Sequence, residues 1–287
     1  MAREGAKRGA PLVSARIWLK GLQAVKLVPV SYEVHKAKKL ASPNSWAFLR
    51  NMPLIGLYEA ELASAARDIP ICFTAEKDSF FPGALMGVRP DVNSFVGQDG
   101  RWCAAHIPWV IRRRPFVLAR VETSENWVLC VDDESELLTE AGGIDLFNAD
   151  GTPAEVITQM TDFLASLERN RTDTVAACIA LDRHGLLVPW DLKVGIPGQD
   201  MKRLDGFYRV DEGTFGRLSA DALLELRDSK ALAMVYAHFI SLTNLSKLGY
   251  FAAAHQEMEA QKASVHSGQW SLDHAFGLVE DEDRFQF

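Results

Sequence analysis

Apolar positions in the first part of the chain occur in short runs separated by turn residues. Three of these runs lie at residues 25–28, 69–73 and 127–131. They are rich in β-branched and aromatic side chains, which favour strands. Asp99-Gly100 lies between β-rich stretches, and Asp-Gly in that setting is a strong signal for a tight hairpin turn. Residues 57–66, rich in Ala, Leu and Glu, favour a helix.

The apolar period changes after residue 151. One helical face is formed by Val156, Ile157, Met160, Phe163, Leu164 and Leu167. This spacing predicts an amphipathic helix, and Thr152-Pro153-Ala154-Glu155 matches a capping box with proline at the first helical position. Further helices are predicted over 174–183, from Ser219 across 223–226, and over 230–247. The last of these has Tyr236 and Ile240 on its inward face.

Together these patterns predict an α+β fold, in which a β-rich N-terminal half with mixed or antiparallel strands packs on a mostly helical C-terminal half. Residues 1–24 show no sustained period and are interpreted as a basic flexible arm. Residues 25–250 form the predicted domain, β-rich over 25–131 and mainly helical over 152–250. Residues 251–287 form a C-terminal extension with an acidic, aromatic tail.

Charge and cysteine content limit the functional classes and cellular locations that the protein can have. The 287 residues carry a formal net charge of −7, which argues against general nucleic-acid affinity. No apolar run approaches the roughly 18 residues that a membrane span needs. The four cysteines form no CxxC pair, and the basic start lacks the apolar stretch of a secretion signal. We therefore expect a cytoplasmic protein with reduced thiols, no zinc site and no membrane span.

The arginine run Arg112-Arg113-Arg114 is the first candidate for ligand binding, because guanidinium groups grip phosphates and carboxylates in a forked geometry. In an extended segment, Arg112 and Arg114 share one face. His35 is a second candidate, since histidine can transfer protons near neutral pH. The alternatives are structural ion pairs for the arginines and a structural hydrogen bond for His35. The candidate ligand-binding residues are thus His35, Arg112 and Arg114.

Other chemistry finds little support in the sequence. Cys103 and His106 form a Cys-x-x-His pair, but on a predicted strand their odd separation places them on opposite faces, which disfavours metal ligation. The chain contains no GxSxG, GxGxxG, Walker-type or HExxH motif. We predict no metal and no cofactor, and the pattern identifies no catalytic residue, so whether the protein is an enzyme stays open.

The C-terminal segment combines aromatic and acidic residues. Its aromatic residues are Trp270, Phe276, Phe285 and Phe287, and an acidic run occupies residues 280–283. Aromatic rings supply buried area at interfaces, while charges steer the encounter. The segment therefore has the character of a docking peptide, either for another protein or for self-association, in which it packs on its own domain or on the basic arm of a second copy.

Several ordered landmarks resemble the bacterial SapC-like family, named after a surface-layer-associated protein. They are Val28-Pro29-Val30-Ser31 with His35, Trp46-Ala47-Phe48, Asp99-Gly100-Arg101-Trp102, residues 107–116, residues 206–212 and residues 236–242. Arg114 stands where the family usually has tyrosine, and Ile69 and Cys72 also depart from its pattern, which is typical of a divergent member. The resemblance covers roughly residues 25–250.

The resemblance implies a cellular context for the protein rather than a biochemical activity. Members of the family are often encoded beside outer-membrane receptors and tryptophan-halogenase-like flavoenzymes, which implies an accessory role in uptake or tailoring. It transfers no catalytic residue. We therefore expect a non-catalytic, cytoplasmic accessory or interaction protein linked to surface-layer or envelope processes. The alternative is an enzyme or small-ligand binder acting on an anionic, amino-acid- or peptide-like compound.

These two hypotheses differ in geometry. A ligand site requires His35 and the arginines to converge on a concave pocket, whereas an interaction protein exposes an apolar or aromatic face.

Overall fold

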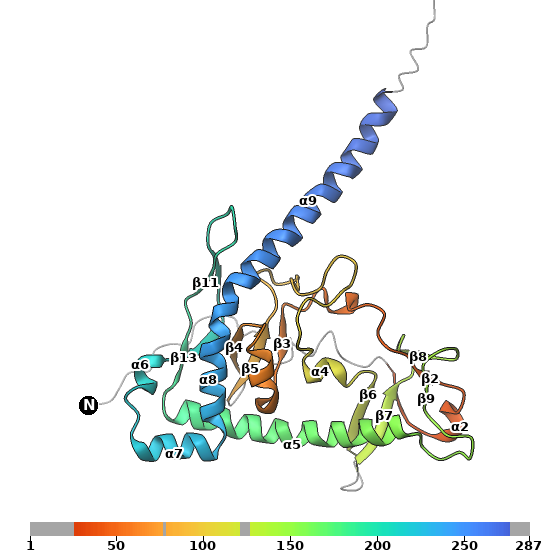
Figure 1. The fold of residues 1–287 in the computed structure, drawn as a ribbon, viewed down its shortest axis with the longest axis horizontal. Helices are drawn as coiled ribbons and strands as arrows, with labels where there is room; N and C mark the ends of the chain where they lie inside the picture. The colour runs from red at the N-terminus through yellow and green to blue at the C-terminus, as the bar shows by residue number, and fades with distance from the viewer. Residues whose placement is uncertain (1–25, 77–78, 121–126, 276–287) are drawn as a thin grey trace, which may run out of the picture.

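The computed structural model describes residues 26–76, 79–120 and 127–275, with side chains described as far as residue 261 except at Arg120. The predicted arm, residues 1–24, lies outside the described residues. The α+β prediction is confirmed: strands dominate the first half of the described chain and helices the second (Figure 1).

The larger sheet has five antiparallel strands in the order β10-β13-β4-β5-β3. Their bounds are Leu187–Pro189, Phe207–Val210, Ile71–Ala75, Phe80–Leu85 and Leu54–Gly56. The centre of β4 is buried on both faces, which explains why its sequence is a continuous apolar run rather than an alternating one. Helix α8 (Ala231–Ser241) contacts β4 and β13, so the C-terminal helices cover this sheet.

A three-stranded antiparallel sheet, β1-β7-β6, lies beside the larger one. Its strands span Leu27–Pro29, Trp127–Asp132 and Phe116–Arg120. A small sheet, β8-β2-β9, consists of Leu138–Thr139, Lys39–Leu40 and Ile144–Asp145. A separate hairpin, β11–β12, consists of Leu192–Val194 and Lys202–Leu204. Short helical segments connect the strands: α2 (Tyr32–His35), η1 (Ala47–Leu49), η2 (Glu59–Glu61), α3 (Leu62–Ala65) and α4 (Trp109–Arg112).

Helix α5, Glu155–Arg183, runs along both sheets (Figure 1). Its first half packs Ile157, Leu164 and Leu167 into a cluster with residues of β6 and β7. Its second half contributes to the main core. The separate helix predicted over 174–183 is therefore wrong: no Gly or Pro interrupts residues 155–183, so the helix continues.

The predicted capping box at the start of α5 is also wrong. The helix begins at Glu155 with Ala154 at its N-cap position and no side-chain cap. Thr152 instead forms hydrogen bonds with Asp150, through its backbone N–H at 2.9 Å and its hydroxyl at 2.6 Å. Asp150 therefore forms a turn before the helix and binds Thr152, so Thr152 does not cap the helix.

The predicted Asp99-Gly100 turn is present, but extended strands do not flank it. Gly100 has a φ of +82°, a conformation that glycine adopts without strain. A single bridge pairs Val96 with Trp102 across the turn. Aromatic packing of Trp102 against Trp46, with ring centroids 6.1 Å apart, holds this irregular region in place.

The C-terminal helices are α6 (Glu212–Phe215), α7 (Ala220–Asp228), α8, η3 (Leu242–Asn244) and α9 (Leu245–Ala275). Tyr236 and Ile240, predicted to face inward, are 53% and 60% exposed. The core side of α8 is formed by Met234, Val235 and His238 instead, because two apolar stripes compete on this helix and one can face the sheet. Helix α9 leaves the body and projects from it (Figure 1).

Within the described residues, no helix is long and apolar enough to cross a membrane.

Candidate functional site

His35 is held by the backbone at the start of α2. Its ring is fully buried, and its Nδ1 lies 3.2 Å from the backbone nitrogen and 3.1 Å from the carbonyl oxygen of Ser31. Nδ1 is therefore engaged by the backbone in either tautomer. Because Ser31 is the residue at the N-cap of α2, the histidine closes the turn that contains it.

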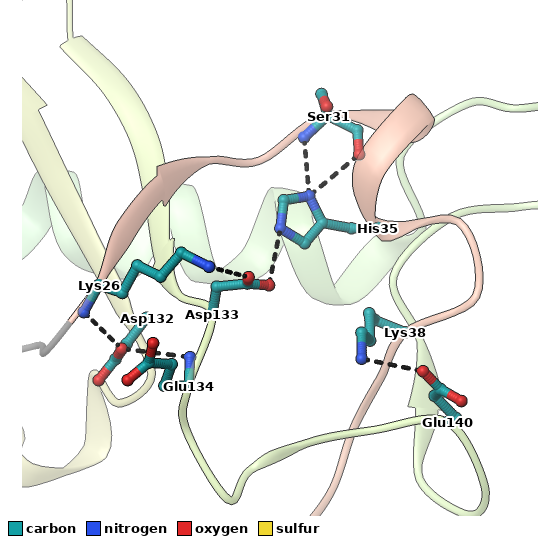
Figure 2. A network of polar contacts seen from close by, with 8 residues as sticks. All are labelled: Lys26, Ser31, His35, Lys38, Asp132, Asp133, Glu134 and Glu140. Carbon is teal, nitrogen blue, oxygen red and sulfur yellow. Dashed lines mark hydrogen bonds and ion pairs between the residues drawn. The ribbon is translucent and has the colours of Figure 1, made fainter.

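The other ring nitrogen of His35 faces an acidic loop (Figure 2). Nε2 lies 3.9 Å from Asp133 Oδ1 and has no hydrogen-bond partner among the described residues. The second carboxylate oxygen of Asp133 accepts a hydrogen bond from Lys26 Nζ at 3.2 Å. Asp132 Oδ1 accepts one from the Lys26 backbone N–H at 3.0 Å. This network joins the start of the described chain to the loop after β7.

The arginine run does not have the extended geometry predicted for it. Arg112 ends helix α4, so the alternating faces expected of a strand do not apply. Pro108 stands at the N-cap of this helix, where its missing N–H costs nothing. The Arg112 guanidinium lies 5.4 Å from the centroid of the Phe163 ring on α5, at a cation–π distance.

Arg114 is held by an aromatic ring and a carboxylate. Its guanidinium lies 4.1 Å from the centroid of the Phe48 ring, and its Nη2 lies 3.4 Å from Glu136 Oε1. Its Nη1 is buried without a hydrogen-bond partner among the described residues. His35 and Arg114 thus contact the same acidic loop through different carboxylates, Asp133 and Glu136, while Arg112 packs on α5.

Sequence reasoning missed a buried acid–histidine pair. Glu61 is buried, and its Oε2 lies 2.8 Å from His106 Nε2 and accepts a hydrogen bond from the Trp109 backbone at 2.8 Å. Its Oε1 accepts a hydrogen bond from the Tyr58 backbone at 3.0 Å. Burial raises the pKa of the Tyr58 hydroxyl, and nearby Arg113 partly offsets this increase. The Glu61 carboxylate therefore links residues 58–61 to residues 106–109.

The strand predicted for Cys103 and His106 is wrong, because this segment is irregular. Aromatic packing of Trp102, rather than a ladder of hydrogen bonds between strands, holds the neighbouring chain. His106 turns toward Glu61. Tyrosine is not a usual N-cap residue, so the spacing of Tyr58 and Glu61 gave no capping signal in the sequence. Among the described residues, no group of three or more His, Cys, Asp or Glu is arranged to hold a metal ion.

A second buried histidine lies in the main core. Nδ1 of His238 lies 2.9 Å from the carbonyl oxygen of Ile71 and donates to it. Nε2 is buried without a hydrogen-bond partner among the described residues. Burial among rings such as Phe73 and Trp190 lowers the pKa of His238 to about 4. The residue is therefore neutral near pH 7 and contacts no solvent.

Single exposed apolar side chains occur on both α8 and α9. Tyr236 and Ile240 are such residues on α8, and Tyr250, 65% exposed, is one on α9. Beside Tyr250 is a groove of about 430 Å³. Its lining residues are Gly195, Ile196, Pro197, Leu245, Ser246 and Tyr250. None of the predicted ligand-binding residues belongs to this lining.

Comparison with models of known protein families gave a match. The family model described as SapC matches residues 30–248, from the end of β1 to the first turn of α9. Neither the curated proteins nor the solved structures gave a match.

Proposed function

Because the chain belongs to the SapC family, we propose that it is a non-catalytic accessory protein that binds a protein partner through its C-terminal segment. The proposal places it in the cytoplasm, in a process linked to the surface layer or the envelope. The observation that carries the proposal is the course of α9, which projects from the body as far as Ala275 (Figure 1).

The base of α9 belongs to the core, and its outer part does not. Leu248 is fully buried and Ala252 nearly so. Further out, Glu259 is joined to the body by an ion pair with Arg89 at 3.0 Å, and positions 259–261 are exposed. At a rise of 1.5 Å per residue, the 25 residues that follow Tyr250, up to Ala275, extend about 37 Å. A segment carried this far supports docking on another molecule rather than packing on its own domain.

The predicted docking residues lie at the outer end of this helix and beyond it. Trp270 belongs to α9, but its side chain is outside the described part, as are Phe276, Phe285 and Phe287 entirely. Their docking role is part of the proposal. It is supported by the combination of aromatic residues with the acidic run at 280–283.

The alternative function, binding or conversion of an anionic amino-acid- or peptide-like compound, has less support. It requires His35, Arg112 and Arg114 to converge on one ligand. Instead, His35 is fully buried, Arg112 stacks on Phe163, and Arg114 is occupied by Phe48 and Glu136. The unpartnered Nη1 of Arg114 is the one observation in favour of a ligand there.

The cytoplasmic location is supported by the cysteines. All four are free thiols, and three of them are buried, as expected in a reducing compartment. Burial raises the pKa of the Cys72 and Cys178 thiols, which keeps them protonated and unreactive.

The proposal is tested by capture from a lysate of the native host, followed by binding of the purified captured protein. The full chain is compared with a chain ending at Ala260, which keeps the buried turns of α9 and the Arg89–Glu259 ion pair. We expect the truncated chain to bind the partner at least 10-fold more weakly. Equal binding by both chains would contradict a docking role for the C-terminal segment.

A metabolite arm tests the alternative function. If neither chain retains a protein and the full chain binds an anionic metabolite, with Arg112→Ala abolishing that binding, the proposal is wrong.

A further inference from the structure

The groove at the base of α9 is lined mainly by apolar residues, which we call its floor. Ile196 and Pro197 follow strand β11, and Leu245 and Tyr250 belong to α9. Gly249 sets the distance between α9 and the loop after β11: a Cβ there would lie 1.9 Å from the Gly195 carbonyl oxygen. The helix and the loop therefore approach each other as closely as a glycine allows.

The loop that lines one side of the groove belongs to the β11–β12 hairpin, and this hairpin carries an exposed cation. Lys202 is exposed on β12 and pairs in register with Val194, next to Gly195. The hairpin turn is attached to α9 by a hydrogen bond between Gln199 and Gln256. An occupant with an apolar part for the floor and an acidic part for Lys202 would match this chemistry.

We propose that the occupant is the C-terminal segment of a second copy of this chain, each copy filling the groove of the other in a symmetric dimer. This inference rests on the proposed function and names its partner. Residues 276–279 of the segment are Phe-Gly-Leu-Val, and acidic residues 280–283 follow directly. This order offers apolar side chains to the floor and carboxylates to Lys202.

The same chain cannot deliver residues 276–279 to its own groove. Residues 276–279 follow Ala275, the last residue of α9, which lies about 37 Å along the helix from Tyr250. Four residues extend at most about 14 Å at roughly 3.6 Å each. Residues 276–279 therefore fall short of the groove of their own chain by roughly 20 Å, even when fully extended.

A second copy removes this mismatch. Suppose that two α9 helices run antiparallel, with Ala275 of each copy opposite Tyr250 of the other. Residues 276–279 of each copy then begin at the groove of the other copy. In this register Glu257 and Glu259 stand opposite positions 268 and 266, which are Gly and His, so no like charges oppose each other. The arrangement is reciprocal, as a two-fold interface requires.

Disulfide cross-linking between full-length chains tests the inference. In a Cys103→Ser background, which removes the one cysteine that is not buried, one preparation carries Tyr250→Cys and another carries Gly277→Cys. We expect mild oxidation of the mixture to give a 250–277 disulfide between two chains. Leu224→Cys, on an exposed apolar position of α7, replaces Tyr250→Cys as the matched control and should not cross-link with position 277.

Light scattering after size exclusion provides a second readout, which does not depend on cysteine. The wild-type chain should be a dimer, and Tyr250→Glu should raise its dissociation constant at least 10-fold, while Leu224→Glu should leave it unchanged. A monomer at all concentrations would overturn the inference. So would a 250–277 disulfide that forms within the double variant but not in the mixture, because that result places each segment in its own groove.

The inference and the proposed function can fail separately. If the chain is a monomer and captures a different protein through its C-terminal segment, the inference is wrong and the proposed function stands. If position 277 does not cross-link to position 250 and the chain ending at Ala260 binds every partner equally well, both are wrong.

Discussion

The buried imidazole of His238 makes the stability of the fold dependent on pH. Its pKa is about 4 in the folded chain, against about 6.5 for an unperturbed histidine. Because the folded pKa is depressed, the stabilisation is present above the unfolded pKa and is lost as the pH falls from 6.5 toward 4. A difference of 2.5 pKa units corresponds to about 3.4 kcal/mol at most.

The effect can be measured between pH 7 and pH 5, where roughly 2 kcal/mol of this amount should be lost. The assay is urea unfolding of the wild-type chain and of His238→Asn at both pH values. Asparagine keeps a side-chain N–H donor for the Ile71 carbonyl and does not titrate. The variant should be less stable at pH 7, because its smaller side chain leaves a cavity.

The decisive quantity is the difference between the two pH dependences. We expect the free energy of unfolding to fall by about 2 kcal/mol more in the wild type than in the variant over this interval. Equal slopes would show that His238 keeps an ordinary pKa in the fold, and the account of its burial would be refuted.

Three further predictions concern stability, each checked by urea unfolding at pH 7. Glu61→Ala should cost roughly 3 kcal/mol or more, because it leaves His106 and two backbone N–H groups without their buried acceptor; a cost below about 1 kcal/mol would contradict this. Gly249→Ala should destabilise the fold by roughly 1–3 kcal/mol through the clash with Gly195, and a gain from helix propensity alone would refute the close approach. Tyr236→Ser should destabilise the fold by roughly 0.5–1.5 kcal/mol, because the side chain is half exposed but its ring packs edge-on against Phe215 at 5.9 Å; a loss above about 3 kcal/mol would show that it packs in the core.

The pattern of apolar and polar residues predicted strands and helices well where it matched one kind of secondary structure. The apolar run at 69–73 lies in or next to β4, which is buried on both faces. The periodic face at 156–167 lies in α5, which is buried on one face and therefore shows a helical period. The same reasoning failed for α8. Its apolar residues cover more than one face, so the pattern could not tell that Tyr236 and Ile240 face outward.

The candidate residues were recognised more readily than their partners. The pattern singled out His35 and Arg114, but the acidic loop that engages both is about 100 and 20 residues away in the chain. Glu61 and His106 are 45 residues apart, and an irregular segment brings them together. Pairings of this kind depend on how the two sheets and α5 are assembled, which no local period encodes.

The central claim, that the C-terminal segment docks on a protein, is tested most directly inside the native host. A photo-reactive amino acid replaces Trp270 in one full-length chain and Ile144, an exposed apolar residue of β9, in another. The account predicts that position 270 cross-links to one defined protein and position 144 does not. No cross-link from position 270, or the same products from both positions, would contradict it.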